Sequence, residues 1–188
     1  MRILAIPGSV RRDSHNARLL RHAAERAPEG VEIEVWEGLK SIPPYDEDDD
    51  GPLAPRPVAE LRRAIAAADG LLFATPEYNS SIPGVLKNAI DWASRPRATT
   101  PLQGKPAAVI GATTGSFGAV WAQAELRKVL ASAGARVIDL DLPLAKAHEA
   151  FDSDGRLTSE PADARGREVL AALAETIAER QVILSFAA

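Results

Sequence analysis

The segment from Gly8 to Asn16 places hydroxyl, amide and guanidinium side chains directly after a short apolar run. Ser9, Ser14 and Asn16 offer neutral hydrogen-bond donors, and Arg11 offers a planar, charged fork that suits phosphate oxygens. If a strand ends here and a helix begins at Ser14, unpaired N–H groups and the helix dipole also favour an anion. The loop fits a phosphate monoester, although a capped helix with surface arginines explains the same residues equally well.

The spacing of this loop argues against two other phosphate-binding motifs. It is not G-x-G-x-x-G, the fingerprint of dinucleotide-binding folds, and it lacks the G-K-[ST] ending of a P-loop. A dinucleotide fold and a P-loop nucleotide triphosphatase are therefore both less well supported.

A second polar segment, Thr75 to Gly84, follows another apolar run and contains Pro76, Glu77, Tyr78 and Asn79. An aromatic side chain and an amide beside a tight proline turn suit a planar heterocycle. The ring can stack on the aromatic group, and main-chain N–H groups can meet the carbonyls and nitrogens at its edge. Taken alone, such residues more commonly form a simple surface turn.

In this order, the motifs resemble those of the NAD(P)H-dependent FMN reductases, including the chromate and quinone reductase branch. The resemblance extends from the first expected strand to about Leu130, and the coincidence of two motifs in order is highly specific. It is carried by Gly8-Ser9-x-Arg11-x-x-Ser14-x-Asn16, by Pro76-Glu77-Tyr78-Asn79, and by Pro83-Gly84-x-Leu86-Lys87-Asn88-x-x-Asp91-Trp92.

The resemblance implies one FMN site built from three loops, without covalent attachment. In the family the first loop holds the phosphate, the second flanks the isoalloxazine ring, and a third, glycine-containing loop lies on the ring's other side. The cofactor-binding residues implied are Ser9, Arg11, Ser14 and Asn16 in the first loop, Pro76, Glu77, Tyr78 and Asn79 in the second, and Thr113, Gly115 and Ser116 in the third.

The segment after the third loop departs from the family at two positions. Ala119 stands where a second glycine is usual, and Trp121 stands where an arginine is common. Contacts from the third loop are therefore expected with less support than those from the other two. We expect Trp121 in the core or at a subunit interface rather than against the cofactor.

The resemblance also implies hydride transfer from the nicotinamide of NADPH or NADH to flavin N5, and onward transfer to a flavin, a quinone or another small acceptor. The cofactor carries that chemistry, so no catalytic side chain and no metal site are assigned. Members of the family commonly form dimers or tetramers, which makes a homodimer or homotetramer the expectation here.

The elements that must position these loops alternate along the chain. The pattern predicts a flavodoxin-like α/β three-layer sandwich, with a five-stranded parallel sheet of order 2-1-3-4-5 and helices on both faces. One domain over residues 1–188 is expected, and the polar segment Phe151 to Arg167 is expected to be a connecting loop. The strands are expected at residues 2–6, 31–35, 71–74, 107–110 and 136–140, and the helices are expected to begin near residues 14, 58, 82, 122 and 170.

Composition narrows the possible partners. The 188 residues contain 22 Lys and Arg against 26 Asp and Glu, a formal net charge of −4, which gives no support for a nucleic-acid partner. There are no cysteines, so disulfides, thiolate metal sites and a cysteine nucleophile are excluded. No apolar run approaches the length of a membrane span. We expect a cytoplasmic protein with no membrane partner.

Two other features are given little weight. The acidic run from Asp46 to Gly51 copies the first half of an EF-hand loop, but its twelfth position is Pro57 rather than glutamate. It is expected to be a solvated loop. His15, His22 and His148 show no metal spacing and are expected at the surface, with His15 close enough to the first loop to touch a ligand.

Two competing functions remain open. A flavodoxin-type electron carrier would bind FMN without pyridine-nucleotide activity, but Arg11, Arg12 and the near-neutral charge argue against it. A dinucleotide-binding sensor without turnover is opposed by the missing glycine fingerprint.

Overall fold

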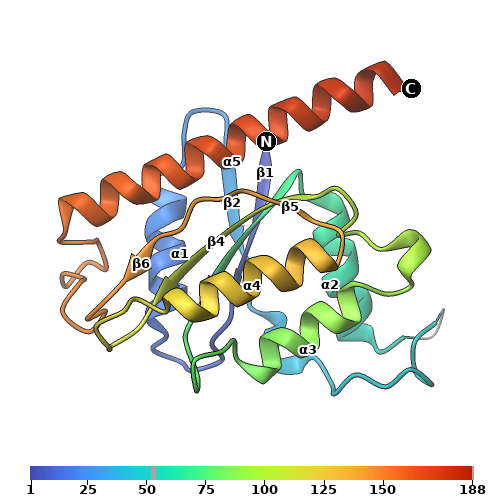
Figure 1. Cartoon of the computed structure of the whole chain (residues 1–188), viewed down its shortest axis with the longest axis horizontal. Helices are drawn as coiled ribbons and strands as arrows, with labels where there is room; N and C mark the ends of the chain where they lie inside the picture. Colours follow the sequence, from blue (N-terminus) through green and yellow to red (C-terminus); the bar gives the residue numbers. More distant parts are fainter. Residues whose placement is uncertain (52–53, 188) are drawn as a thin grey trace.

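The computed structural model describes residues 1–51 and 54–187. Its centre is a parallel sheet in which the strands lie in the order β2-β1-β3-β4-β5, with a short strand β6 also paired to β4 (Figure 1). The predicted strand order is thereby confirmed. The strands are β1 (Arg2–Pro7), β2 (Glu32–Val35), β3 (Gly70–Thr75), β4 (Pro106–Ala112), β5 (Arg136–Val137) and β6 (Pro143–Leu144).

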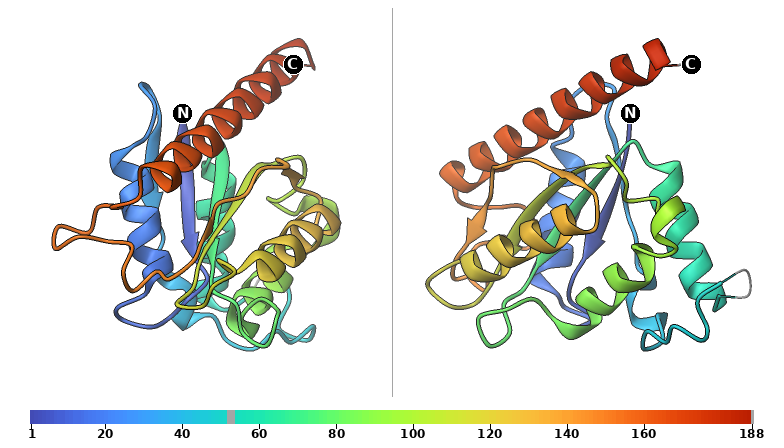
Figure 2. Two further views of the ribbon diagram at one scale, coloured as in Figure 1. Left: turned by 60° about the vertical axis from the view of Figure 1, so that its left-hand side comes forward. Right: turned by 45° about the vertical axis from the view of Figure 1, so that its right-hand side comes forward.

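Helices cover both faces of this sheet, as the predicted sandwich requires. Figure 2 shows α1 and α5 on one side, with α2, α3 and α4 on the other. Two short 3-10 helices, η1 and η2, lie in connecting segments. The bounds are α1 (His15–Glu25), η1 (Gly38–Ser41), α2 (Arg56–Ala67), α3 (Gly84–Ala93), η2 (Arg97–Thr99), α4 (Val120–Ser132) and α5 (Glu160–Ala187).

The central strands are apolar throughout because both of their faces are buried. On β1, Ile3 and Ala5 pack toward α1 and α5, whereas Leu4 and Ile6 pack toward the other three helices. All six residues of β3 and all seven of β4 are buried. This burial on two faces explains why these strands read as continuous apolar runs rather than as alternating patterns.

The fifth strand is shorter than the sequence indicated. A strand was expected over residues 136–140, but β5 ends at Val137, and the chain returns to β4 only at Pro143. The fully buried side chain of Gln123 occupies the gap: its amide donates to the carbonyl of Gly118 and accepts from the N–H of Leu142. A buried amide from α4 thus takes the place of ladder hydrogen bonds.

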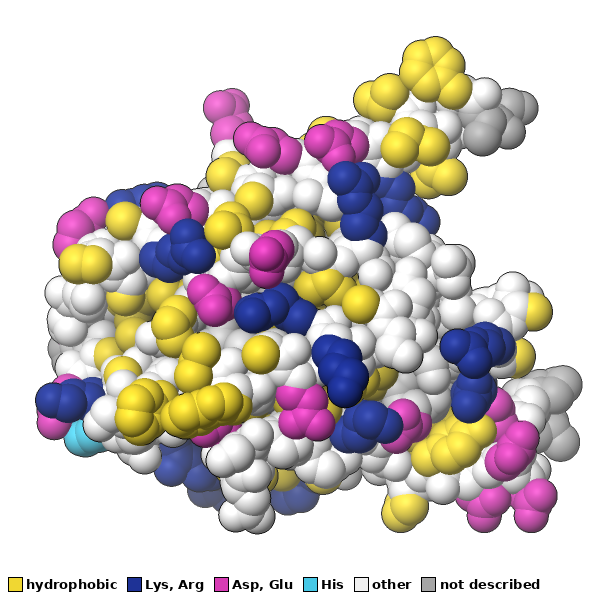
Figure 3. Space-filling model, viewed as in Figure 1, with side chains coloured by type: hydrophobic (Ala, Val, Ile, Leu, Met, Phe, Trp, Pro, Cys, Tyr) yellow, Lys and Arg dark blue, Asp and Glu magenta, His cyan; other side chains and the backbone are white. Residues whose placement is uncertain are grey.

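The expectation of a loop from Phe151 to Arg167 is wrong in its second half, because α5 begins at Glu160. The Ser159 hydroxyl accepts from the N–H of Ala162, Pro161 lies in the first turn, and Glu160 and Asp163 are acidic residues there. These are the usual signals of a helix start. Helix α5 is 28 residues long, and its C-terminal end extends past the sheet, where Figure 3 shows a group of hydrophobic side chains.

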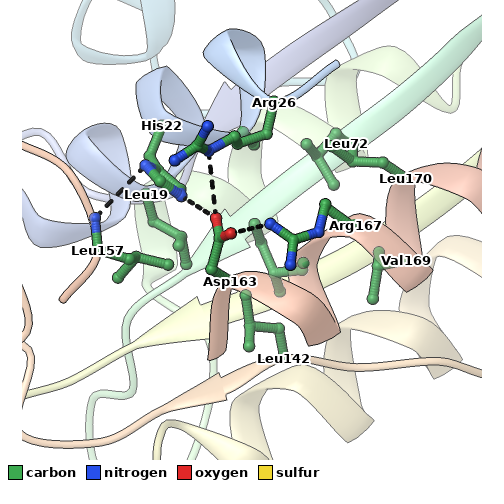
Figure 4. A pocket seen from close by; sticks show the side chains of 13 residues that line it. Leu19, His22, Arg26, Leu72, Leu142, Leu157, Asp163, Arg167, Val169 and Leu170 are labelled. Carbon is green, nitrogen blue, oxygen red and sulfur yellow. Dashed lines mark hydrogen bonds and ion pairs between the residues drawn. The ribbon is translucent and has the colours of Figure 1, made fainter. Parts of the chain in front are cut away.

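His22 is buried, so the expectation that it lies at the surface is wrong. Its side chain is only 4% exposed on α1, and its Nε2 lies 2.6 Å from Oδ1 of Asp163, which is 6% exposed on α5 (Figure 4). Arg26 and Arg167 also pair with Asp163. The first turn of α5 covers this part of α1, and only a hydrogen-bonded pair can be buried there without a large desolvation penalty.

The described part of the acidic loop is solvated at its start and ion-paired at its end. Asp46 to Asp49 are exposed, and Asp50 pairs with Arg62 of α2 at 2.7 Å; residues 52 and 53 of this loop lie outside the described residues. Over residues 1–51 and 54–187, no group of three or more metal-ligating side chains could hold an ion. Within the same ranges, no helix is long and apolar enough to cross a membrane.

Candidate functional site

Three loops meet at the carboxyl ends of the neighbouring strands β1, β3 and β4. They comprise residues 8–14, 76–83 and 113–119, and they lie along the lower edge of the molecule in Figure 1. Ligands of open parallel sheets bind at this end, where the strand order reverses between β1 and β3. All three predicted site segments are therefore brought to one edge.

The first loop presents a row of unpaired donors. In the described part of the chain, the main-chain N–H groups of residues 12–16 donate to no protein acceptor. Ser14 caps α1 by accepting from the N–H of Ala17, and Ser9 accepts from the N–H of Arg11. Both hydroxyls keep their own proton to donate. Arg11 is exposed and donates to the carbonyl of Asp13, which holds its guanidinium over the loop. The arrangement fits an anion.

The side chain of Asn16 joins two elements of the fold. Its side chain is buried, donates to the carbonyl of Ala112 and accepts from the N–H of Ala112, both at 2.9 Å. The amide joins the start of α1 to the end of β4, and a contact from this side chain to phosphate stays a prediction. The main-chain N–H of Asn16 has no acceptor among the described residues.

The second loop ends in a tight turn. Tyr78 and Ser81 exchange both main-chain hydrogen bonds, and the two residues between them, Asn79 and Ser80, have φ of 52° and 60°. Positive φ at both central positions is the type I′ geometry. Tyr78 is 51% exposed, so its ring is available to a ligand. Pro76 is buried at the base of the loop, beside the strand end.

Glu77 contacts the protein rather than open solvent. Its Oε2 accepts from the N–H groups of Trp121 and Ala122, each at 3.1 Å. Helix α4 needs this carboxylate because its own N-cap residue, Ala119, has no side-chain acceptor. The side chain of Glu77 therefore positions the second loop against α4, and its main-chain N–H remains unpaired among the described residues.

The third loop is held from behind by β6. Thr113 donates to Leu144 and accepts from Ala147, and the carbonyl of Gly115 accepts from Lys146. Ser116 and Gly115 are exposed, while Thr113 is half-buried. The predicted residues Thr113, Gly115 and Ser116 therefore lie on the loop as expected, with the outer edge of the loop open.

The end of the third loop explains the family's preference for glycine there. Gly118 has φ of 61°, and a Cβ at this position would lie 2.3 Å from the carbonyl carbon of Pro143. Ala119 also has a left-handed backbone, with φ of 60°. This conformation costs a non-glycine residue about 1–2 kcal/mol. The alanine is accommodated, but with strain that a glycine would not have.

The electrostatic surroundings of the first loop are positive. Burial lowers the pKa of His15, and the charges of Arg11, Arg18 and His148 lower it further. The imidazole Nδ1 is buried and has no hydrogen-bond partner among the residues that the structure describes. A field that disfavours an additional positive charge at His15 favours an anion at the same place.

These observations fit FMN. The unpaired N–H groups and Arg11 suit its phosphate, and the exposed Tyr78 turn and the third loop flank the space where a ring would extend. The sequence pointed to the residues of the three loops, but not to the positioning roles of Asn16 and Glu77. Their partners lie 96 and 44 residues away along the chain.

Comparison with known proteins gives the same result. The model of the family described as NADPH-dependent FMN reductase matches residues 1–149. An NAD(P)H-dependent FMN reductase of Pseudomonas aeruginosa is 44% identical over 163 residues, covering 86% of this chain and 87% of that protein. A 2-hydroxy-1,4-benzoquinone reductase of a Burkholderia species is 39% identical, covering 85% and 87%.

A solved structure supports the fold and the family together. The flavoenzyme FerB of Paracoccus denitrificans, an NAD(P)H:(acceptor) oxidoreductase, superposes with a TM-score of 0.82 at 35% identity, covering 95% of this chain and 97% of that one. With the motifs, the three-loop site and these matches in agreement, the chain belongs to the NADPH-dependent FMN reductase family.

Proposed function

We propose that this protein binds FMN without covalent attachment, reduces it with NAD(P)H and passes the electrons to a small acceptor such as a flavin or a quinone. The observation that carries the proposal is the run of unpaired N–H groups at residues 12–16, beside Arg11 and at the same sheet edge as two further loops. The names of the similar proteins, which include FMN and quinone reductases, support the activity and the acceptor class.

Different groups of the chain would bind the phosphate and the ring of FMN. Ser9, Arg11, Ser14 and the N–H groups of residues 12–16 would hold the phosphate. Pro76, Tyr78 and Asn79 would flank the ring from one side, with Thr113, Gly115 and Ser116 on the other. Bound FMN supplies the hydride acceptor, so the protein needs no nucleophile or general base.

The second loop also contributes electrostatically. The N–H groups of Glu77 and Asn79 make no hydrogen bond within the described residues, and they lie in the turn that would face the ring edge. Donors fixed by the fold stabilise negative charge that develops during a reaction without needing to reorganise. The carboxylate of Glu77, turned toward α4, keeps its charge away from that edge.

An anaerobic titration tests this function. FMN-loaded protein is mixed with NADPH and, separately, with NADH, and the absorbance of oxidised flavin is followed. Rapid bleaching is expected. A protein that binds FMN but is bleached by neither nucleotide would be an electron carrier instead, and a protein that does not bind FMN would remove the whole proposal.

We also propose a homo-oligomer with a cytoplasmic location. Phe117 and Trp121, 65% and 48% exposed, stack edge-to-face with ring centroids 5.0 Å apart at the start of α4. Figure 3 shows a hydrophobic group where this helix begins. Exposed aromatic side chains of this size favour an interaction surface, and Trp121 is not a core residue. NAD(P)H is a reductant of the cell interior, which supports the location.

A further inference from the structure

A second hollow lies beside the first loop, on the side away from β3 and β4. Its volume is about 380 Å³, and it opens between the β1–α1 loop, α1 and the segment that follows β2. The residues that matter for its chemistry are Arg11, Arg12, Arg21, Trp36, Glu37 and Lys40. The hollow shares Ser9, Arg11 and Arg12 with the first loop of the FMN site, whereas Trp36 and Lys40 line the hollow alone.

The hollow is strongly cationic. Arg11, Arg12, Arg21 and Lys40 line it against the single carboxylate of Glu37. Glu37 pairs only with Arg21, at 3.6 Å. Arg12 and Lys40 are exposed and form no ion pair with any described residue. Two free cations from different segments, facing one hollow, suit a ligand with a phosphate group.

The hollow also contains an aromatic wall. Trp36 is half-buried directly after β2, and its main-chain N–H continues the ladder to the carbonyl of Ala5. Its ring lies against Gly38, where a Cβ would come within 2.3 Å of the ring. The missing side chain of Gly38 therefore leaves room for the ring, which also packs against the core. An indole beside cations suits a flat heterocycle attached to a phosphate.

The distance to the flavin edge suits one molecule that reaches both places. Strands β2, β1, β3 and β4 are consecutive in the sheet. With neighbouring strands about 4.8 Å apart, the end of β2 lies roughly 12 Å from the gap between the second and third loops. A ligand held by Trp36 and Lys40 at one end can extend across the first loop to the flavin ring.

We propose that this hollow binds the adenosine end of NADPH, with the 2′-phosphate held by Arg12 and Lys40 and the adenine placed against Trp36. The inference rests on the proposed function and adds to it a choice of reductant: NADPH is preferred over NADH, because only NADPH carries the phosphate that these cations recognise.

Direct binding tests the site without any turnover. FMN-loaded protein is titrated calorimetrically with adenosine 2′,5′-bisphosphate and with adenosine 5′-monophosphate. The bisphosphate is expected to bind about tenfold more tightly, and Lys40→Gln to weaken it about fivefold, the scale of a lost exposed ion pair. The matched control is Lys128→Gln, which removes an exposed lysine from the separate groove between α3 and α4 and should leave binding within about twofold.

A second variant tests the aromatic wall. Gly38→Ala should displace the ring of Trp36 and weaken both nucleotides by similar factors, so that the preference for the 2′-phosphate survives. The flavin spectrum of each variant shows whether FMN is still held, which separates a local effect from unfolding. In steady-state assays, Lys40→Gln should lower the ratio of kcat/KM for NADPH over NADH about fivefold.

The outcomes separate this inference from the proposed function. Equal affinity for the two adenosine phosphates, unchanged binding by Lys40→Gln, or weakening only by Lys128→Gln would overturn the 2′-phosphate site. If NADH bleaches FMN while the bisphosphate does not bind, the site is wrong and the reductase proposal stands. If the bisphosphate binds as expected but neither nucleotide bleaches FMN, the 2′-phosphate site stands and the reductase proposal is wrong.

Discussion

Asn16 and Glu77 lie in the two best-matched motifs, yet their polar side-chain atoms bond to the protein's own backbone. Asn16 joins α1 to Ala112, and Glu77 caps α4. The sequence identifies both positions, because their motifs are specific. It could not assign their roles, because each partner is a main-chain group brought close only by the fold.

Arg11 is the side chain on which phosphate binding should depend most. Arg11→Ala removes one charged donor and is expected to weaken FMN binding by about 1.5–3 kcal/mol, tenfold or more in Kd. Quenching of flavin fluorescence on titration measures this. The control is Arg63→Ala, an exposed arginine on α2 and outside the three loops. Equal FMN affinity in the two variants would remove Arg11 from the phosphate site.

Glu77→Ala should destabilise the protein as well as the site. Helix α4 would lose the side-chain cap that Glu77 gives its N-terminus, a loss of about 1–2 kcal/mol in the free energy of unfolding. Glu77→Gln keeps one acceptor oxygen and should lose less. Urea unfolding of both variants checks the order, and a Gln variant as unstable as the Ala variant would contradict the capping role.

At the level of elements, the contact between α1 and α5 depends on the buried pair His22–Asp163. Leu157 donates its N–H toward Nδ1 of His22 at 3.4 Å, which leaves Nε2 to donate to Asp163. Arg26 and Arg167 approach the same carboxylate (Figure 4). The start of α5 is thus held through the carboxylate of Asp163, which contacts His22, Arg26 and Arg167.

This cluster predicts a stability loss in acid. Burial alone would raise the pKa of Asp163, but the hydrogen bond from His22 and the charges of Arg167 and Arg26 outweigh it and hold the pKa below its ordinary value of 3.8. Because the folded pKa is depressed, the stabilisation is present above about pH 3.8 and is lost as the pH falls through the folded value.

Asp163→Asn should therefore lower the free energy of unfolding by about 2 kcal/mol or more at pH 7, since charge-assisted bonds are lost. The difference from the unsubstituted protein should shrink below pH 4. Denaturant unfolding at pH 7 and near pH 3 measures both values. A difference that does not change with pH would show that the carboxylate charge contributes nothing.

The elements show where sequence reasoning succeeds and fails. Strands β1, β3 and β4 were predicted because burial on both faces leaves an unbroken apolar run. The division between β5 and β6 was not predictable, because the side chain that occupies the gap, Gln123, comes from another element. Ser159 and Pro161 are helix-start signals for α5. The polar turn that follows them has no helical spacing of apolar residues, so the sequence did not predict a helix there.

At the scale of the whole molecule, exposed aromatic groups lie next to the proposed flavin site. Phe117, Trp121 and Tyr78 are each about half exposed or more, on two loops and the first turn of α4 at one edge. A second copy of the chain covering this edge would bury them and would also limit access to the ring. The partly open edge is therefore consistent with a site completed by association.

Trp121→Ser should shift the protein toward the monomer. The substitution removes one of two stacked rings, and burial of such a ring contributes about 1.5–3 kcal/mol to association. Light scattering after size-exclusion chromatography gives the mass. Thr99→Ser, on the exposed segment of η2, is the control. An unchanged dimer or tetramer in the Trp121 variant would place the interface elsewhere.

The three loops of the site are already joined to one another by Gly8–Ala74, Asn16–Ala112 and Glu77–α4 hydrogen bonds. Loops that the protein's own hydrogen bonds hold together lose little conformational freedom on binding, so association needs no slow rearrangement. FMN can then bind to a preorganised site, at rates set by diffusional encounter and by dissociation. The amide protons of Ala112, Trp121 and Ala122 should accordingly be protected from solvent exchange in the apoprotein as strongly as in the loaded protein.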